Sequence, residues 1–333
     1  MAENRVITYA EALREAMREE LRRDDKVFLM GEDIGAYGGC FGVTKGLLEE
    51  FGPVRVRETP ISETAFVGAG IGAAMMGYRP VVEIMFSDFA AVCFDQIVNQ
   101  AAKIHYMSGG KVNVPLVIRT PQGGGTGAAA QHSQTLEALY CHIPGLKVAV
   151  PSDAYDAKGL LKTAIRDNDP VMFLETKLLY KTTGEVPKEE YLIPFGRAAI
   201  KREGTDCTLV CWGGTVPLCL EAANILAAEG ISAEIIDLRT LVPLDMETVM
   251  ESVKKTRRLC IAHEAVKTGG FGAEISARIC ESELFSCLTA PVKRIGAMEC
   301  PMPCSKVLEA AVLPNAEKIA VAVRETVKKP SCV

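Results

Sequence analysis

The feature that most constrains the fold is a regular alternation of short apolar runs with longer helical patterns along the 333-residue chain. Apolar strands buried on both faces and separated by helices of ten or more residues are typical of parallel sheets with crossover helices. The sequence therefore predicts an α/β fold with doubly wound, mainly parallel sheets. The runs expected to form strands are residues 27–30, 81–86, 114–119, 148–150, 171–174, 207–212, 233–238, 259–262 and 291–295, with 54–56 as an edge strand.

The alternation is interrupted at residues 177–194, which are polar and rich in charge. We interpret this segment as a connection or an arm between two domains. At ~150 residues per domain, the chain length also corresponds to about two domains. We expect a first domain over residues 1–200 and a smaller α/β domain over residues 201–333.

Composition excludes several classes of protein. The net charge is −5 and the charged residues are interspersed, so no basic surface for nucleic acid is indicated. The longest uncharged apolar-rich stretch, residues 65–78, is shorter than the ~20 residues that a membrane span needs. The first residues lack the apolar core of a signal peptide. The 12 cysteines are scattered and form no Cys-x-x-Cys pair, which favours free thiols in a reducing cytoplasm.

Local signals mark several helices. Thr8 and Glu11 have the spacing of a capping box at the start of an amphipathic helix. Ser152 is expected to cap a helix over residues 154–166, and further helices are expected over 45–51 and 89–107.

Glu63 is the first candidate functional residue. It follows Pro60 and Ser62 at the start of a glycine-rich apolar helix. A carboxylate at this position is stabilised by the helix dipole, so a plain capping role is one interpretation. The apolar stretch that follows also indicates a carboxylate at the edge of a buried site.

Two glycine-rich segments have open interpretations. Residues 122–127 could cradle a phosphate but lack the Lys-Ser/Thr ending of a P-loop, and they lead to His132 among polar neighbours. His132 is a candidate functional residue, whereas His105, His142 and His263 are interpreted as structural. Residues 68–72 resemble a nicotinamide-binding fingerprint, but the third glycine position holds Ala73, which favours close helix packing. A Rossmann oxidoreductase remains the alternative from a different class.

The segment from Asp167 to Pro170 follows a helix and contains Asn168 and Asp169. Such Asx-rich helix ends are typical of turns. Free carbonyls at a helix C-terminus can also hold a monovalent cation. The spacing alone favours the turn.

Some of these residues belong to a longer series of ordered motifs. The motifs are GED at 31–33, TPISE at 59–63, FDQIVN at 94–99, YMSGG at 106–110, QHSQ at 131–134, PGLK at 144–147, DAKGL at 156–160 and DLRT at 237–240. Through them the chain resembles the β subunits of the thiamin-diphosphate-dependent decarboxylating component of 2-oxoacid dehydrogenase complexes, including pyruvate, branched-chain 2-oxoacid and acetoin dehydrogenases. The resemblance runs from about residue 7 to 327 and implies a pyrimidine-binding domain followed by a transketolase C-terminal-like domain.

The resemblance also implies roles for individual residues. Glu63 would hydrogen-bond the cofactor's aminopyrimidine ring and favour its imino tautomer, and Ile61, Met85 and Phe89 would border that ring. His132 would orient or protonate intermediates and assist transfer to a lipoyl group. A potassium site found in some members would use mostly backbone oxygens, here of Leu116, Ala164, Ile165, Asp167 and Asp169.

One absence is informative beside this resemblance. Thiamin enzymes hold magnesium and the diphosphate through a Gly-Asp-Gly motif, and this chain contains none. The resemblance therefore implies that an α subunit holds both, in an α2β2 heterotetramer that docks on a dihydrolipoyl acyltransferase core. The expected reaction is acetoin cleavage or oxidative decarboxylation of pyruvate, with a branched-chain 2-oxoacid as the alternative substrate.

Overall fold

The computed structural model describes residues 4–328, so the outer ends of the two expected domains, residues 1–3 and 329–333, lie outside the described residues. The chain divides into two compact units. The first contains residues 4–122 and 139–195, and the second contains residues 123–138 and 196–328. The short segment 123–138 therefore packs with the C-terminal unit, although its neighbours on both sides in sequence belong to the first.

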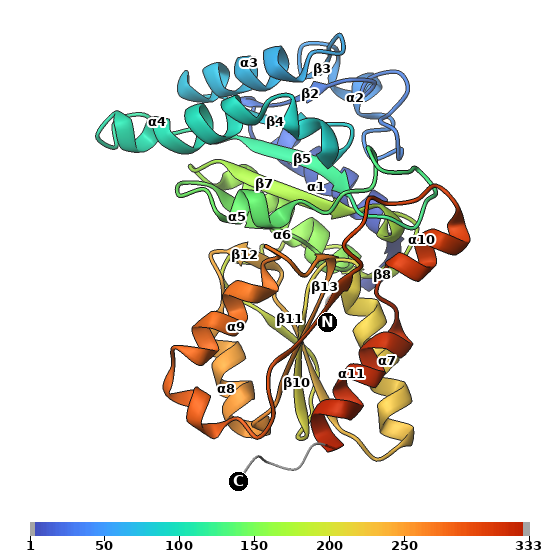
Figure 1. The fold of residues 1–333 in the computed structure, drawn as a ribbon. Coiled ribbons are helices and arrows are strands. Elements are labelled where there is room, and N and C mark those ends of the chain that lie inside the picture. Colours follow the sequence, from blue (N-terminus) through green and yellow to red (C-terminus); the bar gives the residue numbers. More distant parts are fainter. Residues whose placement is uncertain (1–3, 329–333) are drawn as a thin grey trace. The chain divides into compact units, whose positions relative to one another are not determined.

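The first unit contains a parallel sheet with the strand order β6-β7-β5-β4-β2-β3 (Figure 1). Every residue of β5 and β7 is buried, as expected for central strands covered on both faces. The predicted parallel arrangement is confirmed. The strands are β2 (Val27–Gly31), β3 (Val56–Glu58), β4 (Arg79–Glu83), β5 (Val117–Gln122), β6 (Lys147–Ala149) and β7 (Val171–Thr176).

Helices cover both faces of this sheet. α1 (Tyr9–Arg23) packs against α6 (Ala154–Arg166) on one face, and α3 (Glu63–Met75) packs on β4 on the other (Figure 1). The capping box of Thr8 and Glu11 is confirmed. The cap of α6 is Asp153 rather than Ser152, because the Asp153 carboxylate accepts the Asp156 N–H. The shorter helices are α2 (Leu47–Phe51), α4 (Ala102–Met107) and α5 (Glu137–Cys141).

Two expected segments differ in the structure. The single helix predicted over residues 89–107 is divided into a 3-10 turn (Ser87–Ala91), a π-helical stretch (Gln96–Ala101) and α4. The Thr64 hydroxyl donates to the Val92 carbonyl at 2.9 Å and so occupies an acceptor that a continuous helix would use. The expected connection at 177–194 instead contains β8 (Thr183–Pro187), which pairs antiparallel with β1 (Asn4–Thr8).

The second unit is a smaller sheet of order β14-β13-β10-β11-β9, parallel except for β9. α7 (Thr215–Ala228) and α11 (Ala316–Lys328) cover one face, and α8 (Met246–Thr256) and α9 (Gly272–Cys280) cover the other (Figure 1). This unit is therefore doubly wound, as predicted. The remaining elements are β9 (Ala199–Arg202), β10 (Cys207–Cys211), β11 (Ala233–Asp237), β12 (Thr240–Val242), β13 (Leu259–Val266), β14 (Lys293–Ala297) and α10 (Lys306–Val312).

Two absences concern the described part of the chain. No helix within residues 4–328 has the length and apolarity that a membrane crossing requires. The cysteines in the same range are all free thiols.

Candidate active site

The candidate residues of the first unit follow the carboxyl ends of neighbouring parallel strands. Glu32 comes directly after β2, Glu63 begins the helix that follows β3, and Met85 lies two residues beyond β4. The Thr59 N–H donates to the Gly31 carbonyl at 3.0 Å and ties the connection before Glu63 to the end of β2. This edge is where ligands bind in open α/β sheets.

Glu63 is the first residue of α3, where the helix dipole stabilises a carboxylate, as the capping interpretation expects. It is 7% exposed, and Ser62, the N-cap residue of α3, makes no side-chain capping hydrogen bond. Among residues 4–328, no group donates a hydrogen bond to the Glu63 carboxylate. The oxygens of Glu63 are not among the buried side-chain atoms that lack a partner, so they remain in contact with solvent. The site therefore has an acceptor that an external donor would satisfy.

The surroundings of Glu63 concentrate negative charge. Burial raises the pKa of the Glu32 carboxyl, and the neighbouring Glu63 charge raises it further, although the Ser62 N–H donates to Glu32 at 3.3 Å. Burial also raises the pKa of the Cys93 thiol to about 12, again with a contribution from Glu63. These shifts place both Glu32 and Cys93 within electrostatic reach of Glu63.

Apolar side chains border the same region. Ile61 is 83% exposed, and Met85 and Phe89 are half-buried. The rings of Phe89 and Phe86 pack edge to face with centroids 5.6 Å apart. Because Thr64 holds the Val92 carbonyl, the turn that carries Phe89 is tied to the first turn of α3. The structure thus brings the segments of Ile61, Glu63 and Phe89 together.

Sequence reasoning did not identify a buried ion cluster in this sheet. Arg119 of β5 forms two hydrogen bonds with Glu175 of β7, at 2.7 and 2.9 Å, and one with Glu83 of β4, at 2.6 Å. Arg119 is 2% exposed and Glu175 is fully buried. The Tyr180 hydroxyl also donates to Glu175, at 2.7 Å. The only sequence signal is a charged residue within an apolar strand. The cluster fixes three adjacent strands near their carboxyl ends.

The glycine-rich loop belongs to the second unit, together with half-buried His132. Its backbone N–H groups are already bonded to carboxylates of the chain. The Gly124 N–H donates to Glu264, and those of Gly125 and Gly127 donate to Glu309. These amides are therefore not available for a phosphate. In the other glycine-rich segment, close packing explains Gly70, because a Cβ there would lie 2.8 Å from Val82, whereas Gly72 has open space around it.

The oxygens predicted to hold potassium already face protein cations. The Arg79 guanidinium donates to the backbone oxygens of Ile165, at 3.1 Å, and Asp167, at 2.8 Å. Lys147 pairs with the carboxylates of Asp167 and Asp169 at 2.7 and 3.0 Å. The carbonyls of Leu116 and Ala164 accept backbone N–H groups. As they lie in the structure, these residues do not fit an additional cation, and we derive no step through potassium.

Comparisons with known proteins cover both units. Residues 5–183 match the transketolase pyrimidine-binding domain, and residues 196–319 match the transketolase C-terminal domain. The chain is 48% identical to the acetoin:2,6-dichlorophenolindophenol oxidoreductase subunit beta of Bacillus subtilis, covering 98% of this chain and 99% of that protein. It is 50% identical to the pyruvate dehydrogenase E1 component subunit beta of Rickettsia conorii, covering 96% and 98%.

A third relative and a solved structure extend this result. The 2-oxoisovalerate dehydrogenase subunit beta of Bacillus subtilis is 46% identical, over 96% of this chain and 98% of that protein. A split gene transketolase, described as an inactive beta4 tetramer, superimposes with a TM-score of 0.80 at 25% identity. That superposition covers 97% of this chain and 99% of the other.

Proposed function

Because this chain belongs to the family of dehydrogenase E1 β subunits, with transketolase pyrimidine-binding and C-terminal domains, we propose that it serves a thiamin-diphosphate-dependent dehydrogenase. It is an oxidoreductase subunit that acts on oxo groups together with an α subunit. The proposed reaction is cleavage of acetoin or oxidative decarboxylation of pyruvate, followed by acyl transfer to a lipoyl carrier. A branched-chain 2-oxoacid is the second candidate substrate, supported by the 2-oxoisovalerate relative.

The observation that carries this proposal is that Glu63 is 7% exposed and that no group among residues 4–328 donates a hydrogen bond to its carboxylate. Bound thiamin diphosphate would supply an electron sink for cleavage of the carbon–carbon bond. Glu63 would accept a hydrogen bond from the aminopyrimidine ring, with Ile61, Met85 and Phe89 bordering it. The His132 imidazole would donate a proton at the reacting oxygen and assist acyl transfer.

The diphosphate and magnesium are assigned to the α subunit. The chain contains no Gly-Asp-Gly motif, and residues 4–328 contain no group of three His, Cys, Asp or Glu side chains that could hold a metal ion. We therefore propose an α2β2 heterotetramer in which each cofactor is shared between subunits, docked on a dihydrolipoyl acyltransferase core. The free thiols support a cytoplasmic location.

The test is Glu63→Gln in the complex with the α subunit, with Glu58→Gln as the control. Glu58 is an exposed carboxyl at the end of β3. We expect E63Q to lower 2,6-dichlorophenolindophenol reduction at least ~100-fold, in the range of a lost charged catalytic contact, and to weaken thiamin diphosphate binding. E58Q should change neither. Full turnover by an assembled E63Q complex would disprove the role of Glu63.

The same assay identifies the substrate. Acetoin, pyruvate and 2-oxoisovalerate are compared at matched concentrations with the wild-type complex. We expect the highest kcat/KM with acetoin or pyruvate. A preference for 2-oxoisovalerate would assign the chain to the branched-chain class, and no turnover with any of the three would contradict the proposed substrates.

A further inference from the structure

We propose that Glu309 and Glu264 are positioning residues, which fix the loop that carries His132 through hydrogen bonds to its backbone. The inference deepens the proposed function and rests on the role proposed there for His132. All of the residues involved belong to the second unit. Neither glutamate is part of a motif that indicated function from the sequence.

Glu309 holds the loop with both oxygens of its carboxylate. It lies on α10 and is 2% exposed. One oxygen accepts the Gly125 N–H at 2.7 Å, and the other accepts the Gly127 N–H at 2.9 Å. Glu264, on β13, accepts the Gly124 N–H at 2.6 Å and the Thr135 hydroxyl at 3.3 Å. Two carboxylates from distant elements thus bind three amides of one short loop.

The loop has the backbone shape of an anion-binding nest. Gly123, Gly125 and Gly127 have φ values of +97°, +90° and +73°, and Ala129 has +61°. Successive residues that alternate between left-handed and ordinary conformations point their N–H groups toward one concave side and form an anion-binding nest. In this chain the nest is filled by carboxylates of Glu264 and Glu309, so its shape depends on them.

Side chains pack closely against the first residues of the loop. A Cβ on Gly124 would lie 3.1 Å from both Leu313 and Met302, and one on Gly123 would lie 2.6 Å from Glu264. At the other end of the loop, fully buried Glu137 accepts the Trp212 indole N–H at 3.2 Å. His132 lies midway in sequence between Gly127 and Glu137, so both ends of its segment are held.

The chemical consequence concerns the position of the His132 imidazole. Proton transfer and acyl transfer depend on placement of the reacting groups, and a displacement of ~1 Å costs about 100-fold in rate. Removal of the Glu309 carboxylate would leave the Gly125 and Gly127 amides without their acceptors and allow the loop to move. Cofactor contacts made by Glu63 lie in the first unit and do not depend on these bonds.

The experiment uses the complex with the α subunit and compares Glu309→Ala, Glu309→Gln and His132→Ala. Glu317→Ala is the control, because Glu317 is an exposed acid on neighbouring α11. Three quantities are measured: hydrogen exchange at the Gly125 and Gly127 amides, thiamin diphosphate affinity, and kcat for acylation of a lipoyl domain. The isosteric E309Q retains one acceptor oxygen and covers the case in which E309A does not fold.

We expect E309A to accelerate amide exchange at Gly125 and Gly127 and to slow acylation by ~10- to 100-fold. Cofactor affinity should stay within about two-fold, E309Q should be intermediate, and E317A should be unchanged. The double variant E309A/H132A should be no slower than H132A, since residues that act as one unit are not additive.

Three results would overturn the inference. If E309A acylated the lipoyl domain at the wild-type rate while H132A was slow, the role of His132 would stand and positioning by Glu309 would be disproved. Multiplicative losses in the double variant would show that the two residues act separately. Acylation by H132A at the wild-type rate would instead overturn the role proposed for His132, and with it the inference.

Discussion

His263 shows how strongly a single buried side chain is constrained in the second unit. It is fully buried and stacks on Trp212 with ring centroids 5.3 Å apart and planes inclined by 12°. Burial, together with the charge of Arg294, lowers the pKa of His263 to about 4. The neutral imidazole is therefore part of the packed core, which agrees with the structural role expected for it from the sequence.

This depressed pKa predicts a loss of stability in mild acid. The unfolded chain takes up a proton at His263 below about pH 6.5, whereas the folded chain does so only near pH 4. The neutral His263 therefore does not oppose folding at pH 7, but protonation of the unfolded chain lowers the free energy of unfolding by about 2 kcal/mol at pH 5. Fluorescence of Trp212, the only tryptophan, reports denaturant unfolding at both pH values. His263→Phe should remove this part of the pH dependence, and an unchanged profile would contradict the prediction.

Some residues of the proposed site could be predicted from the sequence and others could not, for a physical reason. Glu63 and His132 were candidates because each lies in a suggestive local pattern, and the family resemblance supplied the roles proposed for them. Glu309 and Glu264 were missed because their partners are backbone amides 184 and 140 residues away in the chain. Backbone N–H groups have no residue-specific signature, so only the fold shows which carboxylate they bind.

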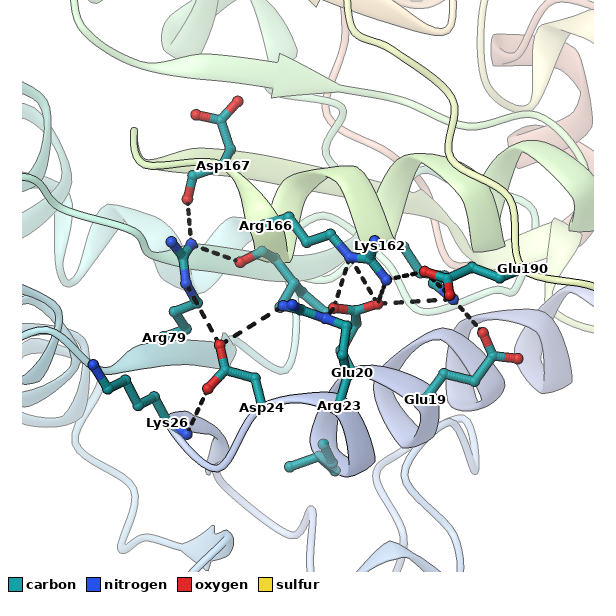
Figure 2. Close-up of polar contacts among 12 residues, drawn as sticks. Glu19, Glu20, Arg23, Asp24, Lys26, Arg79, Lys162, Arg166, Asp167 and Glu190 are labelled. Carbon is teal, nitrogen blue, oxygen red and sulfur yellow. Dashed lines mark hydrogen bonds and ion pairs between the residues drawn. The ribbon is translucent and has the colours of Figure 1, made fainter.

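At the level of elements, buried strands were the easiest to predict and polar contacts between helices the hardest. Apolar runs locate β5 and β7, whereas β1 and β8 are more polar and gave no strand signal. α1 and α6 meet through charged side chains, among which fully buried Glu20 lies between Arg23 and Arg166 (Figure 2). Helical periodicity places such residues in solvent, so a charged interface between the two helices was not expected.

Arg79 joins the start of β4 to the C-terminal ends of α1 and α6. From the start of β4 its guanidinium binds the carbonyl of Ile165 in the last turn of α6 and that of Asp167 just beyond it. It also lies 3.9 Å from Asp24, the C-cap residue of α1 (Figure 2). Arg79→Met should lower the free energy of unfolding by about 2–3 kcal/mol, because several acceptors lose a charged donor. Thermal unfolding measures the loss. Arg22→Met, at a 63% exposed arginine of α1, should cost less than about 1 kcal/mol.

The same variant tests the potassium prediction. With Arg79 removed, the freed oxygens could accept a monovalent cation. We expect replacement of sodium by potassium to raise the Tm of R79M more than that of the wild type. An equal potassium effect on both proteins would show that the guanidinium does not compete with the ion. If potassium changed the Tm of neither protein, these residues would not form a cation site.

For the whole molecule, the sequence predicted two doubly wound α/β units but not the path of the chain between them. The pattern of strands and helices fixes the class of fold, because each element must bury its apolar surface. It does not show that residues 123–138 pack with the C-terminal unit, since this loop is held by backbone amides and by Glu137 rather than by an apolar pattern.

The missing diphosphate motif predicts that the chain is incomplete as a catalyst. The purified single chain should show no turnover and should bind thiamin diphosphate with magnesium far more weakly than the complex does. Isothermal titration calorimetry and dye reduction, each with and without the α subunit, measure both properties. Rapid turnover by the single chain would mean that this polypeptide holds the diphosphate itself.

The path of residues 123–138 also affects how this protein could be rearranged in evolution or by protein engineers. A chain break near residue 195 would separate most of the second unit from residues 123–138, which bind Glu309, Glu264 and Trp212. In a chimera with the C-terminal half of a relative, that half would pack against residues 123–138 of the first protein. Such chimeras should therefore fold only when residues 123–138, Glu264 and Glu309 come from the same protein.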